Sequence, residues 1–257
     1  MGAADARHTP AAFATLARVT EVYLEAGKRR VFACAVHWPG WCRAAKTEEA
    51  ALSALAAAAP RYAPVCALAG IIFDASSAAA ALEVVERVAG SATTDFGALD
   101  VPPRVDSTAL TEQEASRLAA LAEAAWQTFG EVAAGAPAEL RKGPRGGGRD
   151  KAAIVDHVLE TEVLHARMLG LRHRPFPPGD QAAADLVRAD ILAAIRSAVP
   201  VPQRGTAGAA SPGPAPGAAP PAMPPEGAAR GRRPARFVAR RTAWHALDHA
   251  WEIQDRA

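Results

Sequence analysis

The segment RRTAWHALDHAWEIQDRA, residues 240–257, decides how the second half of the chain folds. Its pattern predicts the end of a helix that spans about 235–256. His245 and His249 are four residues apart, so on a helix their rings project from the same face. Two ligands of one metal ion need this arrangement. A third ligand must then come from another part of the chain.

A second predicted helix, over about 151–169, supplies a candidate for that third ligand. His157 shares a helical stripe with Ile154 and Thr161, which places it on or near the side facing the core. If this helix lies beside the last one, His157 is opposite the histidine pair. Three imidazoles with one open position are typical of a catalytic divalent-metal site. The alternative is that these histidines are hydrogen-bonded core residues with a structural role.

Three acids lie three residues after a candidate ligand: Glu252, Asp248 and Glu160. Metal-bound histidines usually donate their second N–H to a carboxylate or carbonyl, which sets the tautomer. We therefore expect these acids to orient the histidines, the alternative for each being a solvated helix face.

Trp244 and Trp251 form a stripe beside the histidines. They are expected either to pack in the core or to form the wall of a substrate pocket. Arg240 and Arg241 are expected to form a surface patch rather than to hold a substrate.

Two further helices complete the second half of the chain. Thr111 and Glu114 form a capping box that begins the first of them, and another is predicted over about 181–198. A Pro/Gly/Ala-rich insertion at about 200–233 has no periodicity and is expected to be disordered. Four helices joined in this way predict a four-helix bundle over 108–257.

The first half, residues 18–105, has a mixed pattern and makes the predicted fold class α+β. Two β-rich runs separated by a turn predict a hairpin at its start. Thr47 is the expected N-cap of a helix that stops before Pro60. A third apolar run and a helical stretch near 77–89 are expected to follow.

Composition limits the classes of function. The chain has 257 residues and a formal charge of +2. This near-balanced charge lacks the strong excess of basic residues that is typical of nucleic-acid-binding domains. Its 3 cysteines suggest no disulfide framework and fit a reducing compartment. The N-terminus lacks a signal-peptide core, and no run of about 18 uncharged apolar residues is evident. We expect a soluble, cytoplasmic protein that does not bind membranes.

Residues 108–257 resemble the DinB-like family, also called the YfiT-type four-helix bundle. The resemblance rests on DHVLETE, with His157, and WHALDHAWE, with His245 and His249. It implies a metal site formed by these three histidines, and imidazole ligands suit zinc or nickel. It also implies a small thiol cofactor such as mycothiol or bacillithiol. The Pro-rich insertion and the lack of a visible substrate signature depart from the family pattern.

The segment FACAVHWPGWCRAAKTEEAALSAL, residues 32–55, is similar to the HicB-like fold. Lys46 replaces the glycine common before the capping threonine. HicB-like antitoxins bind a small toxin and often carry a DNA-binding module, but no helix-turn-helix is evident here. The resemblance therefore implies the fold alone.

Together these observations predict a metal-dependent enzyme that carries out thiol transfer or hydrolysis on a small molecule. No residue is assigned as catalytic. The alternative is a non-catalytic binding or regulatory module with a structural metal and a protein partner at the N-terminal domain. A homodimer is compatible with both.

Overall fold

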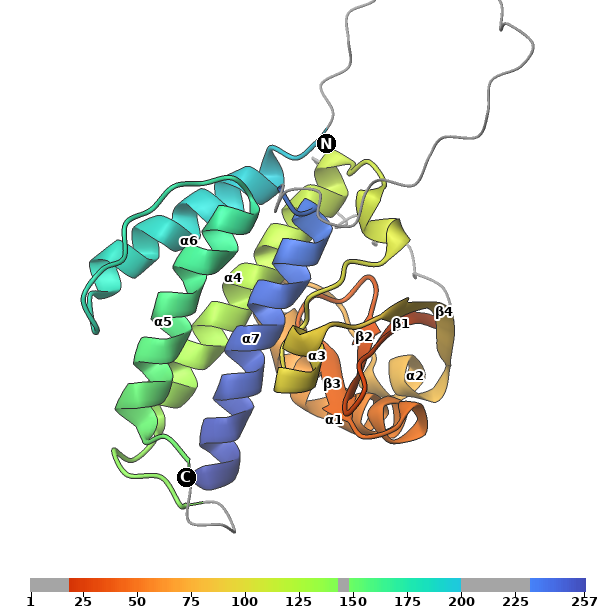
Figure 1. The fold of residues 1–257 in the computed structure, drawn as a ribbon, viewed down its shortest axis with the longest axis horizontal. Coiled ribbons are helices and arrows are strands. Elements are labelled where there is room, and N and C mark those ends of the chain that lie inside the picture. The colour runs from red at the N-terminus through yellow and green to blue at the C-terminus, as the bar shows by residue number, and fades with distance from the viewer. Residues whose placement is uncertain (1–18, 143–147, 200–231) are drawn as a thin grey trace, which may run out of the picture.

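The computed structural model describes residues 19–142, 148–199 and 232–257. The fold is mixed α+β, as predicted, with a four-stranded sheet in the N-terminal part and long helices after it (Figure 1). Most of the insertion expected to be disordered, residues 200–231, lies outside the described residues. Its last two residues are described. The backbone N–H of Arg233 donates to the carbonyl of Met168 at 2.7 Å, at the end of the helix that carries His157.

The sheet has the strand order β3-β2-β1-β4. The predicted hairpin is confirmed, since β1 pairs with β2 in antiparallel register. β2 pairs with β3 in the same sense, and β4 lies parallel to β1. The strands are β1 (Thr20–Ala26), β2 (Val31–Ala35), β3 (Cys42–Ala45) and β4 (Leu82–Ala89).

Helix α1 (Glu48–Leu68) begins at the predicted cap but does not stop before Pro60. The Thr47 hydroxyl accepts from the backbone N–H of Ala50, and the helix continues through both Pro60 and Pro64. A proline inside a helix removes one backbone hydrogen bond. Tertiary contacts oppose that loss, because the Trp41 side chain donates to the carbonyl of Leu55 and the helix buries a row of side chains against the sheet. The expected end of this helix was wrong.

The expectation of a helix near 77–89 was also wrong. A short helix, α2 (Ala75–Ala80), is followed directly by strand β4. Burial in β4 alternates from one residue to the next, as in a strand with one covered face. β3 was not predicted at all. Two short elements follow β4: α3 (Ala92–Phe96) and the 3-10 turn η1 (Arg104–Ser107).

Four long helices form the rest of the fold. The capping box at Thr111 and Glu114 is present, with hydrogen bonds in both directions. α4 packs against α6 and α7, and α5 packs against the same two helices. The four are α4 (Glu112–Gly135), α5 (Lys151–Met168), α6 (Gln181–Arg196) and α7 (Ala235–Arg256).

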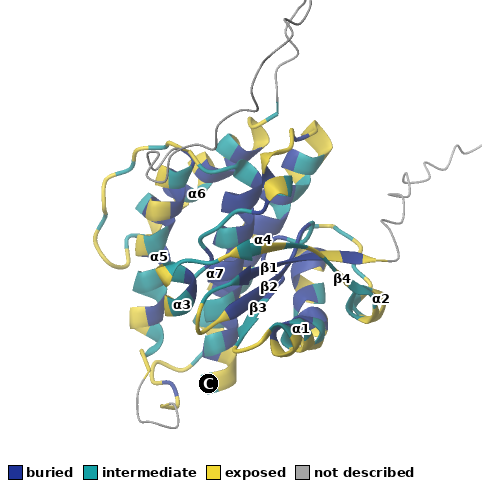
Figure 2. Cartoon of the chain, turned by 45° about the vertical axis from the view of Figure 1, so that its right-hand side comes forward, coloured by how far each residue is buried: buried dark blue, intermediate teal, exposed yellow. Residues whose placement is uncertain are grey.

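Helix α7 packs against the sheet through Trp244 and Arg240, and α4 also contacts the N-terminal part, through α1. Of the 22 residues of α7, 14 are buried, so α7 has no fully exposed face (Figure 2). The other face of the sheet packs on α1, and one cluster of buried apolar residues includes members of the sheet, α1 and all four long helices. Gly40, with a φ of +93°, lets the loop after β2 approach α7, since a Cβ there would lie 2.7 Å from a Leu247 methyl group.

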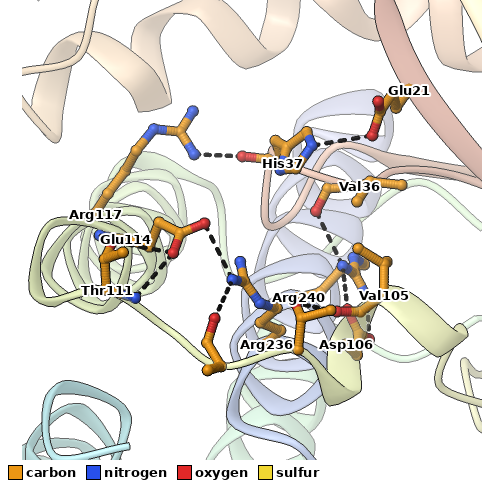
Figure 3. Close-up of polar contacts among 12 residues, drawn as sticks. Glu21, Val36, His37, Val105, Asp106, Thr111, Glu114, Arg117, Arg236 and Arg240 are labelled. Atoms are coloured by element: carbon orange, nitrogen blue, oxygen red, sulfur yellow. Dashed lines mark hydrogen bonds and ion pairs between the residues drawn. The ribbon is translucent and has the colours of Figure 1, made fainter. Parts of the chain in front are cut away.

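A buried ion pair joins α7 to the turn before α4. Arg240 is 1% exposed and donates to both carboxylate oxygens of Asp106, at 2.6 and 2.9 Å (Figure 3). It also donates to the carbonyl of Val36 at 2.9 Å. The expectation that Arg240 belongs to a surface patch was wrong, because the sheet covers this side of the helix.

Helix α1 is long and apolar enough to span a membrane by length and composition alone. The sequence expectation overlooked it, since its single charged side chain beyond the first turn, Arg61, interrupts the apolar run. In the fold its buried side chains pack against the sheet, as those of a core helix do. One such helix is weak evidence for a membrane protein.

We predict that Asp106→Asn lowers the free energy of unfolding by about 3–5 kcal/mol, because it leaves the Arg240 guanidinium buried without a counter-charge. The double variant Asp106→Leu/Arg240→Met should lose clearly less than the sum of the two single variants. Urea unfolding of the wild type, Asp106→Asn, Asp106→Leu, Arg240→Met and the double variant measures both quantities. Additive losses would show that the two side chains do not act as a pair.

Candidate metal centre

Helices α5 and α7 bring three imidazoles together. His157 comes from α5, and His245 and His249 come from successive turns of α7. The ring centroids of the three pairs lie 5.1, 5.0 and 4.8 Å apart. One nitrogen from each ring lies within 4.8 Å of the other two. The three residues singled out from the sequence therefore lie close enough to bind one metal ion.

The nitrogen positions fit a divalent ion. The Nε2 atoms of His157 and His245 are 3.2 Å apart. Two nitrogens bound tetrahedrally to one zinc ion, each at about 2.0–2.1 Å, are separated by roughly 3.3 Å. Two neutral imidazoles joined by a hydrogen bond also lie at this distance. The argument for a metal site therefore rests on the presence of a third imidazole and on the three nitrogen donors together.

Burial keeps two of these rings neutral. Desolvation lowers the pKa of His157 to about 4, and it holds the pKa of His245 well below its usual range, helped by the neighbouring histidines. A neutral imidazole keeps a lone pair free for an ion, whereas a protonated one does not. Both rings are therefore in the form that binds metal at neutral pH.

Glu252 contacts one of the three histidines. Its carboxylate lies 2.8 Å from Nδ1 of His249 and also accepts from Arg256 at 2.7 Å. The hydrogen bond to His249 is the main reason that the pKa of Glu252 is lowered, so the group is an ionised acceptor. His249 then carries its proton on Nδ1, which leaves the Nε2 lone pair for an ion.

The structure does not bring the other two acids to a histidine. Asp248 accepts from Arg43 at 2.8 Å, and this pair joins α7 to β3. Glu160 is exposed on α5. In the described ranges, no hydrogen bond or ion pair links Asp248 or Glu160 to one of the three rings.

Both tryptophans have packing contacts with the N-terminal part. The Trp244 ring meets Phe32 edge-on at 5.4 Å and is 4% exposed. Trp251 is 2% exposed and lies under the guanidinium groups of Arg43 and Arg61, at 4.2 and 5.3 Å. These contacts face the sheet and α1, which corresponds to core packing, the first of the two roles expected from the sequence.

A fourth histidine near the cluster was missed. His165 on α5 is 1% exposed, and its ring lies 5.6 Å from that of His245. Within the described parts of the chain, neither of its nitrogens has a hydrogen-bond partner. Burial lowers its pKa to about 3. The sequence offers a weak signal for it, since His165 follows His157 by two helical turns.

Arg241 adds a positive charge beside the cluster. It lies one turn before His245 on the same face of α7, and its Nε and Nη1 atoms are buried without a partner among the described residues. Its charge contributes, after burial, to the lowered pKa of His165. The sequence expectation of a surface patch was therefore wrong for Arg241 as well.

The three histidines differ in their exposure to solvent. His245 is 8% exposed, whereas the side chain of His249 is 15% exposed and His157 is partly exposed. A ligand can therefore approach from the side of His157 and His249. The arrangement combines three nitrogen ligands, one orienting carboxylate and a nearby guanidinium group.

Comparison with known proteins finds no matching family model, no similar curated protein and no similar solved structure. The DinB-like and HicB-like resemblances therefore stay predictions from the motifs.

We predict that Glu252→Gln weakens binding of zinc by about 10–100-fold, the usual effect of removing a carboxylate that orients a ligand histidine. Asp248→Asn is the matched control, since it makes the same chemical change on the same helix at a residue that contacts Arg43 instead. Competition titration with a chromogenic chelator gives both affinities. Equal affinities in the two variants would contradict the orienting role.

A second prediction concerns pH. The folded-state pKa of His165, about 3, lies below the unfolded value of about 6.5, so the unfolded chain binds more protons between these limits. Stability is therefore lost as pH falls below about 6.5, by about 2 kcal/mol at pH 5 from His165 alone. His165→Leu removes this part of the loss. Urea unfolding of the metal-free proteins at pH 7 and pH 5 tests it, and identical pH dependence in both would refute it.

Proposed function

We propose that the chain binds one divalent ion, zinc or nickel, through His157, His245 and His249, and that the ion serves thiol transfer or hydrolysis on a small molecule. The observation that carries the proposal is the convergence of three imidazole nitrogens on one point, with two of them 3.2 Å apart. Neutral nitrogen donors suit both metals.

A divalent ion held by three neutral imidazoles keeps its full charge and lowers the pKa of a thiol or water at its open position. The chain's own residues support this chemistry. Glu252 orients His249, and burial keeps His245 neutral. Arg241 forms no ion pair within the described residues, although Asp100 and Glu25 act on its charge from a greater distance, and its buried Nε and Nη1 atoms have no hydrogen-bond partner there. Its positive charge therefore favours an anionic ligand such as a thiolate beside it.

The finer parts of the proposal follow from the family resemblance. Residues 108–257 would form a DinB-like bundle, and the thiol would be a small cofactor such as mycothiol or bacillithiol. The N-terminal part would have the HicB-like fold, and a protein partner for it belongs to the alternative of a binding module. The partial exposure of His157 and His249 supports access for a small molecule rather than a closed site.

A structural metal is the second candidate, and one observation favours it. The helix that carries two of the histidines also covers the sheet, through Trp244 and Arg240. An ion that links α5 to α7 would then stabilise the contact between the bundle and the N-terminal part. In this case the metal supports a binding or regulatory module without catalysis.

Metal analysis of the purified protein tests the site itself. We predict about one divalent ion per chain in the wild type and loss of most of it in His245→Ala/His249→Ala, because one imidazole cannot hold the ion alone. His173→Ala is the control, since His173 pairs with Asp190 away from the cluster. Equal metal content in the wild type and the double variant would refute the site.

Chelation separates the two candidate functions. For an enzyme, turnover of an electrophile with a small thiol stops when the ion is removed, and each single histidine variant loses about as much activity as the double variant. For a structural metal, chelation lowers the melting temperature and no thiol-dependent turnover is found. Turnover that survives both chelation and the double substitution would exclude the metal as catalyst.

A further inference from the structure

Two of the three cysteines lie opposite each other in the sheet. In the antiparallel pair of β2 and β3, Cys34 is the direct partner of Cys42, and both side chains are 0% exposed. Their spacing in the sequence suggested no such pair. Cys66 lies apart from them, on α1, and belongs to a different cluster of buried residues.

The backbone hydrogen bonds show which kind of cross-strand pair this is. The N–H of Ala35 donates to the carbonyl of Trp41 at 3.0 Å, so these two residues form a hydrogen-bonded pair. Hydrogen-bonded and non-hydrogen-bonded pairs alternate along an antiparallel ladder. Cys34 and Cys42 are therefore a non-hydrogen-bonded pair. In agreement, the N–H of Cys42 donates to the carbonyl of Gly40 at 3.0 Å rather than to β2.

A pair of this kind has the geometry that a disulfide needs. The Cα atoms of a non-hydrogen-bonded pair lie about 4.5 Å apart, and its side chains are close together. Disulfides join Cα atoms about 4.4–6.8 Å apart. Burial raises the pKa of Cys34, and the Cys42 thiol raises it further, because the two groups are in contact. An S–S bond can thus form without a large movement of either strand.

The exchange requires a local opening of the sheet, because the folded chain covers both thiols. β3 has 4 residues and is an edge strand that pairs with β2 alone. Such a strand can detach while the long helices stay folded. In the closed sheet the raised pKa keeps Cys34 a thiol, which is not the reactive form. Oxidation therefore proceeds through the open form, and the disulfide is held when β3 returns.

We propose that Cys34 and Cys42 are a dithiol that forms a reversible intramolecular disulfide by exchange with a small-molecule disulfide. The thiolate of one cysteine attacks a sulfur of the small disulfide, which gives a mixed disulfide and releases one small thiolate. The thiolate of the other cysteine then attacks the cysteine sulfur of the mixed disulfide and releases the second small thiolate. Two electrons pass to the small disulfide, and its two halves take up the two protons that the cysteines lose.

The bond ties β3 to the sheet on the side where α7 packs. Trp244 of α7 belongs to the same buried cluster as both cysteines. β3 also holds α7 directly, since Arg43 donates to Asp248 at 2.8 Å and lies 4.2 Å from the centre of the Trp251 ring. Oxidation therefore stiffens the support of the helix that carries two of the histidines.

Incubation of the folded, metal-free full chain with oxidised glutathione tests the proposal. The chain is then alkylated with iodoacetamide in denaturant and digested with trypsin. Residues 31–43 form one peptide that contains both cysteines, since it follows Arg30 and ends at Arg43. After oxidation this peptide should carry no alkyl group and be about 2 Da lighter than its dithiol form. Cys66 should remain alkylated, and reduced glutathione should restore two alkyl groups to the peptide.

The melting temperature shows whether the bond fits the native sheet. It should rise by roughly 5 °C on oxidation of the wild type and of the control Cys66→Ser, because the cross-link restricts the unfolded chain. It should not change in Cys34→Ser or Cys42→Ser.

Three results overturn the proposal, and each is measured on the wild type, so that none depends on a variant folding. They are two alkyl groups on the 31–43 peptide after oxidation, glutathione that stays attached to it, and a melting temperature that falls on oxidation. Because the protein is metal-free, none of these outcomes bears on the histidine site.

Discussion

The enclosure of Arg240 is the constraint on which the rest of the structure depends. A guanidinium group with 1% exposure cannot remain in a protein interior without an anion, and Asp106 supplies one through two hydrogen bonds. The pair holds α7 against the turn before α4, and the bond to Val36 holds the same helix against the sheet. The position of α7 relative to the N-terminal part is thereby set by directional contacts as well as by apolar packing.

The two sides of α7 have different roles, because residues at helical spacing fall on separate faces: one face packs on the sheet and the other presents the histidines. Arg240 and Trp244 face the sheet, whereas His245 and His249 face α5. Because α7 is packed on both sides, its histidines are held by a rigid element rather than by a loop, which suits a site that must present ligands in a fixed geometry. The same packing removes water from His245 and keeps it neutral. The burial of α7 therefore both stabilises the fold and keeps the His245 imidazole neutral and fixed in position, as a metal ligand must be.

Local signals predicted the parts of the fold that local energetics control. The capping box at Thr111, the extent of α7 and the hairpin all follow from neighbouring residues. The expectations for α1 and β4 failed for different reasons. Two prolines argue locally against α1, and packing against the sheet outweighed that propensity. Residues 82–89 carry a local strand signal in Val84, Val85 and Val88, which the expectation of a helix near 77–89 overlooked, and their pairing with β1 comes from a part of the chain far away in sequence.

The sequence by itself determined that His245 and His249 share one face of a helix, because a spacing of four residues leaves no other geometry. It also placed Glu252 within reach of His249. Only the tertiary structure decided that His157 meets the pair, that His165 and Arg241 lie beside it, and that Asp248 turns to Arg43 instead. Which face of a helix meets which neighbour depends on how whole elements pack, and the energy of that packing is spread over side chains far apart in the sequence.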